Sequence, residues 1–281
     1  MKETCEFRVV EEFAPQLFEA SEGKRLGDSV RQVEIATNDS RFNAIGRLQF
    51  ETRAKTDRSF FYGWILRRRY SKAELEDAAL FRLKLTSTFE PAGEECGTKY
   101  DESTACPRCG AGAKPTTPLY LPEKRMPKSK DVSRTIAGEI VVSRRVAELF
   151  ARHEITGAEL LPVRSNPSSS AESKDWFQLT VPKADAEISA PTRLGIDPFD
   201  DDEKGECRCP LGDLIGLNLL SEVSIKSTSR GNADIISSRQ VVGVRRGLLR
   251  PERIILVSPK VRRLIESEKL KGVEIEVAHL V

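Results

Sequence analysis

The sequence predicts a mixed α+β fold in which two related strand–helix–strand units surround mixed sheets and a loop region carries a zinc knuckle. Three observations lead to this prediction. Short apolar runs with the two-residue period of strands alternate with segments that have the period of helices. Two stretches of the chain repeat one pattern at an offset of 115 residues. Paired cysteines lie in loop-rich segments, which need an external staple to fold.

We expect three regions along the chain: an N-terminal α/β region at residues 1–90, a zinc-knuckle loop segment at 91–135 and a C-terminal α/β region at 136–281. Composition sets these boundaries, because proline, glycine, cysteine, lysine and threonine dominate the middle region and apolar periodicity disappears there. The C-terminal region holds both copies of the repeated pattern, at 140–163 and 255–278.

Composition limits the classes of function. The chain has 281 residues, and 45 Lys and Arg side chains nearly balance 43 Asp and Glu side chains. This balance argues against a dedicated nucleic-acid binder, which normally carries a strong basic excess. No stretch reaches the roughly 18 apolar residues that a membrane span needs, and the first residues lack the apolar core of a signal peptide. We therefore expect a cytoplasmic protein with no membrane partner.

Local patterns in the N-terminal region predict a strand, a helix and a second strand in succession. The aromatic run at residues 59–66 reads as a buried strand that the three following arginines end. Ser71 with Glu74 three residues later forms a capping box, which starts a helix. Phe81 and Leu83 then alternate with polar residues, so a strand follows the helix.

The repeated pattern predicts two strand–helix–strand units, one at 140–163 and one at 255–278. The ungapped matches pair Val142 with Val257, Ser143 with Ser258, Val146 with Val261, Leu149 with Leu264, Gly157 with Gly272 and Glu159 with Glu274. In each copy the matched serine suits a helix N-cap. The matched glycine suits the left-handed turn that ends or follows a helix. The apolar matches recur at helical spacing, so each helix is expected to bury one face.

A paired-cysteine motif predicts one structural zinc ion. Cys106 and Cys109 lie in the sequence CPRCG, in which a tight turn lets two thiolates face one ion. A single knuckle needs two further ligands, and Cys207 with Cys209 is the other closely spaced pair in the chain. Because this second pair reads CxC, an alternative is that Cys209 ligates with Asp213 or Cys96. A redox dithiol and unliganded buried thiols are the remaining readings of these cysteines.

No pattern of catalytic residues stands out. The two histidines, His153 and His279, belong to no recognisable nucleophile–base arrangement. The sequence contains neither a phosphate-binding loop nor a dinucleotide-binding fingerprint. We therefore expect a protein without enzymatic activity, and an enzyme with an unrecognised site is the competing reading.

Charge is segregated along the C-terminal region. Between residues 239 and 263 eight basic side chains accompany one acid, and between 185 and 206 eight acids accompany two basic side chains. Such segregation is expected of an interface that steers a charged protein partner. Arg245, Arg246 and Arg250 are the candidate partner-binding residues, because arginine is frequent among the side chains that anchor interfaces.

Three phrases of the sequence resemble a bacterial family. They are CGTKYDESTACPRCGAG at 96–112, GEIVVSRRVAELF followed by TGAELLPV, and CPLGDLIGLNLLSE at 209–222. They are similar to double-CXXCG motif proteins, which include myxobacterial immunity proteins for swarming-inhibition toxins. The resemblance covers about residues 59–281, and in this chain its second cysteine motif reads CRCPLGD. It implies a cytoplasmic protein that neutralises a partner toxin by stoichiometric binding.

The sequence thus predicts a non-enzymatic, zinc-stabilised binding protein of the immunity type. The alternative is a zinc-ribbon accessory protein that binds nucleic acid through the basic patch at 239–263. The salt dependence of any nucleic-acid binding distinguishes the two hypotheses, because affinity for phosphate groups falls steeply as the salt concentration rises.

Overall fold

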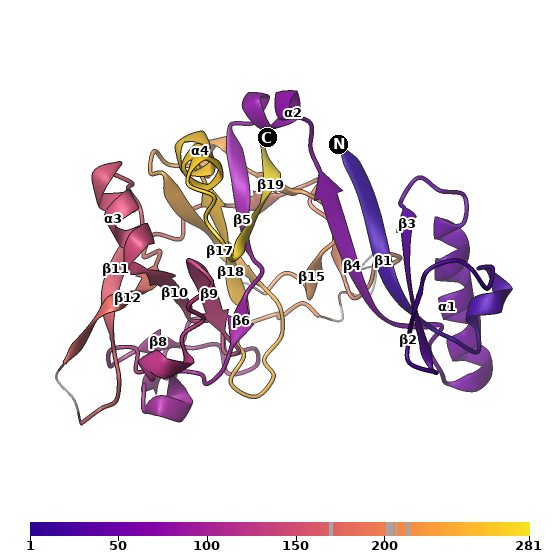
Figure 1. The fold of residues 1–281 in the computed structure, drawn as a ribbon, viewed down its shortest axis with the longest axis horizontal. Coiled ribbons are helices and arrows are strands. Elements are labelled where there is room, and N and C mark those ends of the chain that lie inside the picture. The colour runs from indigo at the N-terminus through magenta and orange to yellow at the C-terminus, as the bar shows by residue number, and fades with distance from the viewer. Residues whose placement is uncertain (169–170, 201–204, 206, 212–213) are drawn as a thin grey trace. The chain divides into compact units, whose positions relative to one another are not determined.

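A computed structural model describes residues 1–168, 171–200, 205, 207–211 and 214–281 (Figure 1). The chain divides into two compact units. Unit 1 comprises Met1–Asp77 with Asp197–Asp201, and unit 2 comprises Ala78–Ile196 with Asp202–Val281. Helices and mixed sheets occur together, which confirms the α+β class. In the described part of the chain, no helix combines the length and the apolar character that crossing a membrane requires.

Unit 1 is an antiparallel sheet packed against one long helix. The strand order is β2-β3-β1-β4. The strands are β1 (Lys2–Val10), β2 (Lys24–Leu26), β3 (Val30–Ala36) and β4 (Phe61–Arg69), and the helices are α1 (Phe42–Thr56), α2 (Lys72–Asp77) and the single 3-10 turn η1 (Ala14–Gln16). Alternate residues of β1, among them Phe7 and Val9, share one buried cluster with Ile45 of α1. Figure 1 shows α1 alongside this sheet.

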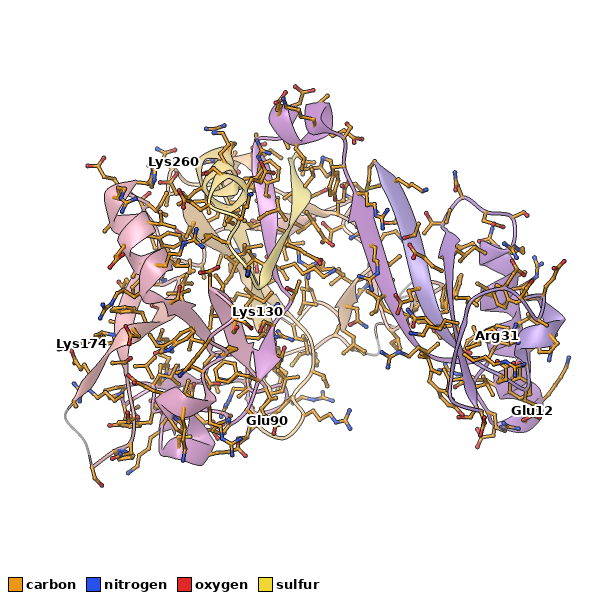
Figure 2. All side chains as sticks on the ribbon, viewed as in Figure 1. Glu12, Arg31, Glu90, Lys130, Lys174 and Lys260 are labelled. Atoms are coloured by element: carbon orange, nitrogen blue, oxygen red, sulfur yellow. The ribbon has the colours of Figure 1, made fainter. Side chains whose placement is uncertain are left out.

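A buried ion pair links β3 to the chain between β1 and β2. Arg31 on β3 is only 2% exposed (Figure 2). Its Nε donates to Glu11 at 3.0 Å and its Nη2 donates to the same carboxylate at 2.5 Å. Its Nη1 donates to the carbonyl oxygen of Glu19 at 2.6 Å. A buried charge needs such pairing, so Arg31 joins the first loop to the sheet.

The prediction for the aromatic strand needs correction. β4 continues through the arginines to Arg69 and is not buried throughout, since Tyr62 is 67% exposed. The physical reason is that β4 pairs with β1, whose acids neutralise the arginines: Glu3 accepts from Arg68 at 2.7 Å. The capping box that follows is confirmed. The Ser71 amide donates to the carboxylate of Glu74 at 2.8 Å, and the Glu74 amide donates to the Ser71 hydroxyl at 3.3 Å.

Unit 2 contains mixed sheets. Its larger sheets have the orders β11-β12-β10-β9-β6 and β13-β16-β19-β5-β18-β17, and β7-β8 and β14-β15 form small pairs. The strands are β5 (Leu80–Leu85), β6 (Thr88–Phe89), β7 (Tyr100–Asp101), β8 (Lys114–Pro115), β9 (Val132–Thr135), β10 (Ile140–Ser143), β11 (Glu159–Arg164), β12 (Glu172–Thr180), β13 (Ile188–Ser189), β14 (Leu194–Gly195), β15 (Asn218–Leu219), β16 (Val223–Ile225), β17 (Ile235–Val242), β18 (Glu252–Val257) and β19 (Val273–Leu280). The helices are α3 (Arg144–Arg152), α4 (Pro259–Ser267) and the 3-10 turns η2 (Glu94–Cys96), η3 (Glu123–Arg125) and η4 (Ser227–Ser229). The strand that the sequence predicts around Phe81 and Leu83 is β5.

The segments 140–163 and 255–278 fold as β10-α3-β11 and β18-α4-β19. Each is preceded by an antiparallel partner strand, β9 for β10 and β17 for β18. The inner faces of the two helices share one core, because Leu149 of α3 and Leu264 of α4 belong to the same buried cluster. The strand–helix–strand elements therefore lie where the sequence pattern predicts them.

Asp131, which precedes β9, ties together the start of one helix and the end of the other segment's helix. Its carboxylate lies 3.4 Å from the hydroxyl of Ser143, at the N-cap of α3. The same carboxylate accepts from the amide of Lys271, just after α4, at 2.9 Å. Arg145 lies 3.6 Å from it. Ser143 makes no side-chain cap bond to α3, so its hydroxyl serves Asp131.

Asp234, which precedes β17, makes the corresponding contacts for the other segment. It accepts from the hydroxyl of Ser258 at 2.8 Å, from the amide of Thr156, after α3, at 3.2 Å, and it lies 3.5 Å from Lys260 (Figure 2). Ser258 also caps α4 by accepting from the Val261 amide at 3.4 Å, as predicted. Each aspartate thus joins its own helix N-terminus to the turn before the other segment's last strand.

Both matched glycines are required by backbone geometry. Gly157 has φ +94° and Gly272 has φ +97°, which confirms the predicted left-handed turns. A Cβ on Gly157 would lie 1.9 Å from the carbonyl oxygen of Ile235, and one on Gly272 would lie 1.9 Å from that of Val132. Each glycine therefore lets the backbone of one segment approach the strand that precedes the other segment, β17 for Gly157 and β9 for Gly272.

Truncation of either helix face tests this shared core. We predict that Leu149→Ala and Leu264→Ala each lower the free energy of unfolding by about 2–5 kcal/mol, because each removes buried methyl groups and leaves a cavity. The exposed neighbours Glu148→Ala and Arg263→Ala serve as controls, with changes within about 0.5 kcal/mol. Urea unfolding measures all four variants, and a loss confined to one helix would contradict a core that depends on both.

Candidate metal centre

Three cysteine sulfurs lie together in unit 2. Among the described residues, the thiols of Cys106, Cys109 and Cys209 form a group whose ligand atoms all lie within 4.8 Å of one another. The sulfurs of Cys106 and Cys209 are 3.5 Å apart, although the two residues are 103 positions apart in the sequence. These three thiols could hold a metal ion.

A tight turn presents the first two thiols. The Gly110 amide donates to the carbonyl oxygen of Cys106 at 2.8 Å, and the Cys106 amide donates to that of Ala111 at 2.8 Å. Gly110 has φ +70°, in the region that favours glycine. The tight turn also directs the backbone amides of Cys109 and Arg108 at the Cys106 sulfur. These hydrogen bonds lower the pKa of the Cys106 thiol to about 7.

The end of β17 supports the third thiol. The Cys209 amide donates to the carbonyl oxygen of Leu214 at 3.1 Å, and Leu214 forms a bridge with Val241 of β17. Cys109, Leu214 and Val241 form a small buried cluster, against which the other two cysteines pack. This apolar packing raises the pKa of the Cys109 thiol to about 11, because burial disfavours the thiolate. A cation at the site would offset that cost by pairing with the thiolate.

The remaining candidate ligands differ in their positions. Cys207 is half-buried and does not join the group of three. Cys96 packs against a different apolar cluster, which contains Leu119 and Leu121. Asp213 lies outside the described residues. The structure thus brings three of the four predicted cysteines together, and their binding of a metal stays a prediction.

Two of the candidate partner-binding arginines make ion pairs with the knuckle segment. Arg250, whose side chain is 17% exposed, lies 2.6 Å from the carboxylate of Glu94 and 2.7 Å from that of Glu102. Its guanidinium lies over the ring of Tyr100, 4.7 Å from the centroid. Arg245 reaches Glu102 at 3.0 Å. These arginines hold the 94–110 segment against the β17–β18 connection.

Arg246 differs from its two neighbours. It lies at an exposed tight turn, where its amide and that of Leu249 donate to each other's carbonyl oxygens at 3.0 Å. Within the described residues no ion pair involves its side chain. Of the three arginines that the sequence singles out, it is the one that makes no ion pair with the described residues.

A buried acid that the sequence pattern does not reveal, Glu139, binds the start of the knuckle segment through hydrogen bonds. Glu139 accepts from the hydroxyl of Tyr100 at 3.1 Å and from the amide of Gly93 at 3.1 Å, and the Thr135 hydroxyl also donates to it. The charge of Glu139 and burial together raise the pKa of Tyr100, with burial the larger cause. No local pattern distinguishes Glu139 from a surface acid, so only the fold reveals its role.

The two histidines occupy structural or surface positions. His153 is the C-cap of α3, and its amide donates to the carbonyl oxygen of Leu149. His279 on β19 lies 2.7 Å from the carboxylate of Glu222. Among the described residues, no hydrogen bond joins either imidazole to a cysteine or serine side chain.

No protein-family model and no curated protein matches this sequence. The site therefore has to be interpreted from its own geometry.

The ion pairs at the knuckle predict unequal effects for neighbouring arginines. We predict that Arg250→Ala lowers the free energy of unfolding by about 1–3 kcal/mol, because it leaves Glu94 partly buried without its cation. Arg246→Ala changes it by no more than about 0.5 kcal/mol. Chemical denaturation compares the two, and equal effects would show that the ion pairs do not hold the segment.

Proposed function

We propose that this chain is a non-enzymatic binding protein, stabilised by one zinc ion, that neutralises a partner protein toxin by stoichiometric binding. The observation that carries the proposal is the meeting of Cys106, Cys109 and Cys209 across 103 residues of sequence. A metal at that point joins the loop-rich knuckle segment to the end of β17. The same segment is held by Arg245 and Arg250, so the proposed ion acts as a staple within a binding scaffold.

The thiol geometry fits zinc. Tetrahedral zinc with Zn–S bonds of about 2.3 Å keeps its sulfurs about 3.8 Å apart. The 3.5 Å between the Cys106 and Cys209 sulfurs and the 4.8 Å limit on the group require small movements to reach this spacing. Backbone amides directed at the Cys106 sulfur favour its thiolate, which is the form that binds metal. When bound, zinc supplies cross-linking between the two segments.

We assign the fourth ligand to Cys207. It lies two residues before Cys209, so a local rearrangement of this chain segment can bring its thiol to the same ion. Four protein ligands close the coordination sphere and leave no position for a water nucleophile. A closed site agrees with a structural ion and with the absence of catalysis that we propose.

Internal duplication accounts for the paired architecture of unit 2. Asp131 and Asp234 make matched contacts to Ser143 and Ser258, and each also accepts from the amide that precedes the other segment's glycine. The cations that accompany them, Arg145 and Lys260, both lie two residues after those serines. Chance similarity of two ordinary strand–helix–strand segments does not account for this reciprocity, so we infer that β9–β11 and β17–β19 derive from one ancestral unit.

Resemblance to immunity proteins motivates the partner class. The matching phrases cover the knuckle, the first strand–helix–strand segment and the chain after Cys209. Arg246 is the surface arginine that we retain as a partner-binding residue. The nucleic-acid alternative is weakened, because Glu94 and Glu102 neutralise Arg250 and Arg245 within the basic stretch.

Cysteine substitutions test the zinc staple. We predict about one zinc per purified chain, and we predict that Cys106→Ser, Cys109→Ser and Cys209→Ser each lower both zinc content and melting temperature, since metal binding is coupled to folding. Cys207→Ser should do the same if it supplies the fourth ligand. Cys96→Ser is the matched control and should keep the metal. Plasma emission spectrometry measures the zinc content, and thermal unfolding measures the melting temperature. A wild-type chain without zinc, together with melting temperatures that the three substitutions leave unchanged, would refute the staple.

Co-expression tests the partner class. The chain is produced together with the product of the adjacent gene in a sensitive host, and growth and co-purification are measured. We predict rescue of growth and a complex of equal stoichiometry, which Arg246→Glu weakens without loss of zinc. A toxic neighbour product that is neither neutralised nor bound would contradict the immunity proposal.

A further inference from the structure

Unit 1 has an aromatic slot that is filled by a distant part of the chain. The ring of Phe199 stacks on Phe7, with centroids 5.9 Å apart and planes 9° apart. It also lies 4.8 Å from Phe42 and 6.2 Å from Phe61. The three rings belong to β1, α1 and β4, and Phe199 packs on the same buried cluster. We call the surface formed by Phe7, Phe42, Phe61 and Gly46 the aromatic slot.

Gly46 shows that the slot is built for a ring. It lies in the interior of α1, where glycine is unfavourable because it loses more chain entropy than other residues. A Cβ at this position would lie 2.7 Å from two ring atoms of Phe199. Glycine therefore opens the helix surface to a flat side chain.

The segment that fills the slot has a self-contained shape. The carboxylate of Asp197 accepts from the amide of Phe199 at 3.0 Å, and its carbonyl oxygen accepts from the amide of Asp200 at 3.1 Å. These bonds form a turn around the buried Pro198 and place the ring at its end. Because the turn depends on its own residues, a short peptide with this sequence can adopt it.

The surface beside the slot can contact a longer ligand. Phe50 is 76% exposed and follows Gly46 by four residues, so it continues the helix row of Phe42 and Gly46. Arg47 is exposed next to this row, and within the described residues no ion pair involves it. An apolar side chain and a negative charge on the ligand would match these groups.

We propose that the aromatic slot is a binding site for a phenylalanine in an acidic segment of a partner protein, and that the segment at residues 197–200 is the chain's own competing ligand. We infer the chemical character of the partner segment from the segment that now fills the slot. Its sequence, DPFDDDE, joins one aromatic ring to several acids. Partner binding then displaces Phe199, so the intramolecular segment sets the threshold for capture. The proposal rests on the proposed protein-binding function for its biological partner and does not depend on zinc.

A peptide experiment tests the slot with the full chain. The probe is a fluorescein-labelled peptide with the sequence of residues 194–205, LGIDPFDDDEKG. Phe199→Ala empties the slot, and fluorescence anisotropy should show saturable peptide binding to this variant. Wild-type chain should bind at least about tenfold more weakly, because its own segment competes. A peptide with alanine in place of its phenylalanine should not bind.

A second variant separates slot binding from other effects. Phe199→Ala combined with Gly46→Leu fills the space with an aliphatic side chain that favours helix, and peptide binding should be lost. Phe199→Leu, which keeps apolar packing, gives a folded alternative and should bind the peptide with intermediate affinity. Circular dichroism verifies folding of each variant.

Two results would overturn the proposal: no binding of the peptide to either folded Phe199 variant, or equal binding to Phe199→Ala and to the variant in which Gly46→Leu also fills the slot. Because the assay contains no toxin, its failure removes the slot and leaves toxin neutralisation to the co-expression experiment.

Discussion

Three thiols meet at one point in unit 2, and in our proposal the knuckle segment depends on the metal that they hold. Between β6 and β9 the chain forms only two-residue strands and 3-10 turns among the elements described, so little backbone pairing orders it. The thiols of Cys106 and Cys109 lie close to that of Cys209, and Arg250 forms ion pairs with Glu94 and Glu102 of the same segment. A covalent or metal-mediated link is most effective where it closes a long loop, because it removes the most freedom from the unfolded chain. The ion that we propose therefore stabilises the part of unit 2 with the weakest core of its own.

Two polar clusters join the two strand–helix–strand segments to each other. Asp131 and Asp234 each bind a helix start and the turn after the opposite helix, so neither segment is complete without the other. Gly157 and Gly272 allow the close backbone approach that this exchange requires. Apolar packing of α3 and α4 supplies most of the stability, and the aspartates fix the register in which the segments meet.

Local features of the fold follow from local sequence. The serine–glutamate capping box at the start of α2, the strand β5 and the left-handed glycines depend on residues a few positions apart, and the structure confirms each. Cysteine spacing predicted for the same reason that Cys106 and Cys109 lie close together, and their binding of zinc stays a prediction. The ion pairs of Arg250 and the contact of Phe199 with Gly46 join residues more than a hundred positions apart, and no periodic pattern carries that information.

The prediction that β4 is buried throughout was wrong because an apolar run does not reveal which face an edge strand turns to solvent. The ion pairs of Arg245 and Arg250 with Glu102 could not be predicted either, because the sequence places that acid far from both arginines.

X-ray absorption at the zinc edge tests the central claim most directly, because it counts the sulfurs around the metal in the intact protein. The account predicts a shell of three or four sulfurs at about 2.3 Å in the wild-type chain, with one sulfur fewer in Cys209→Ser if that variant retains metal. A zinc bound only by nitrogen and oxygen, or a folded chain that binds no zinc, would contradict it.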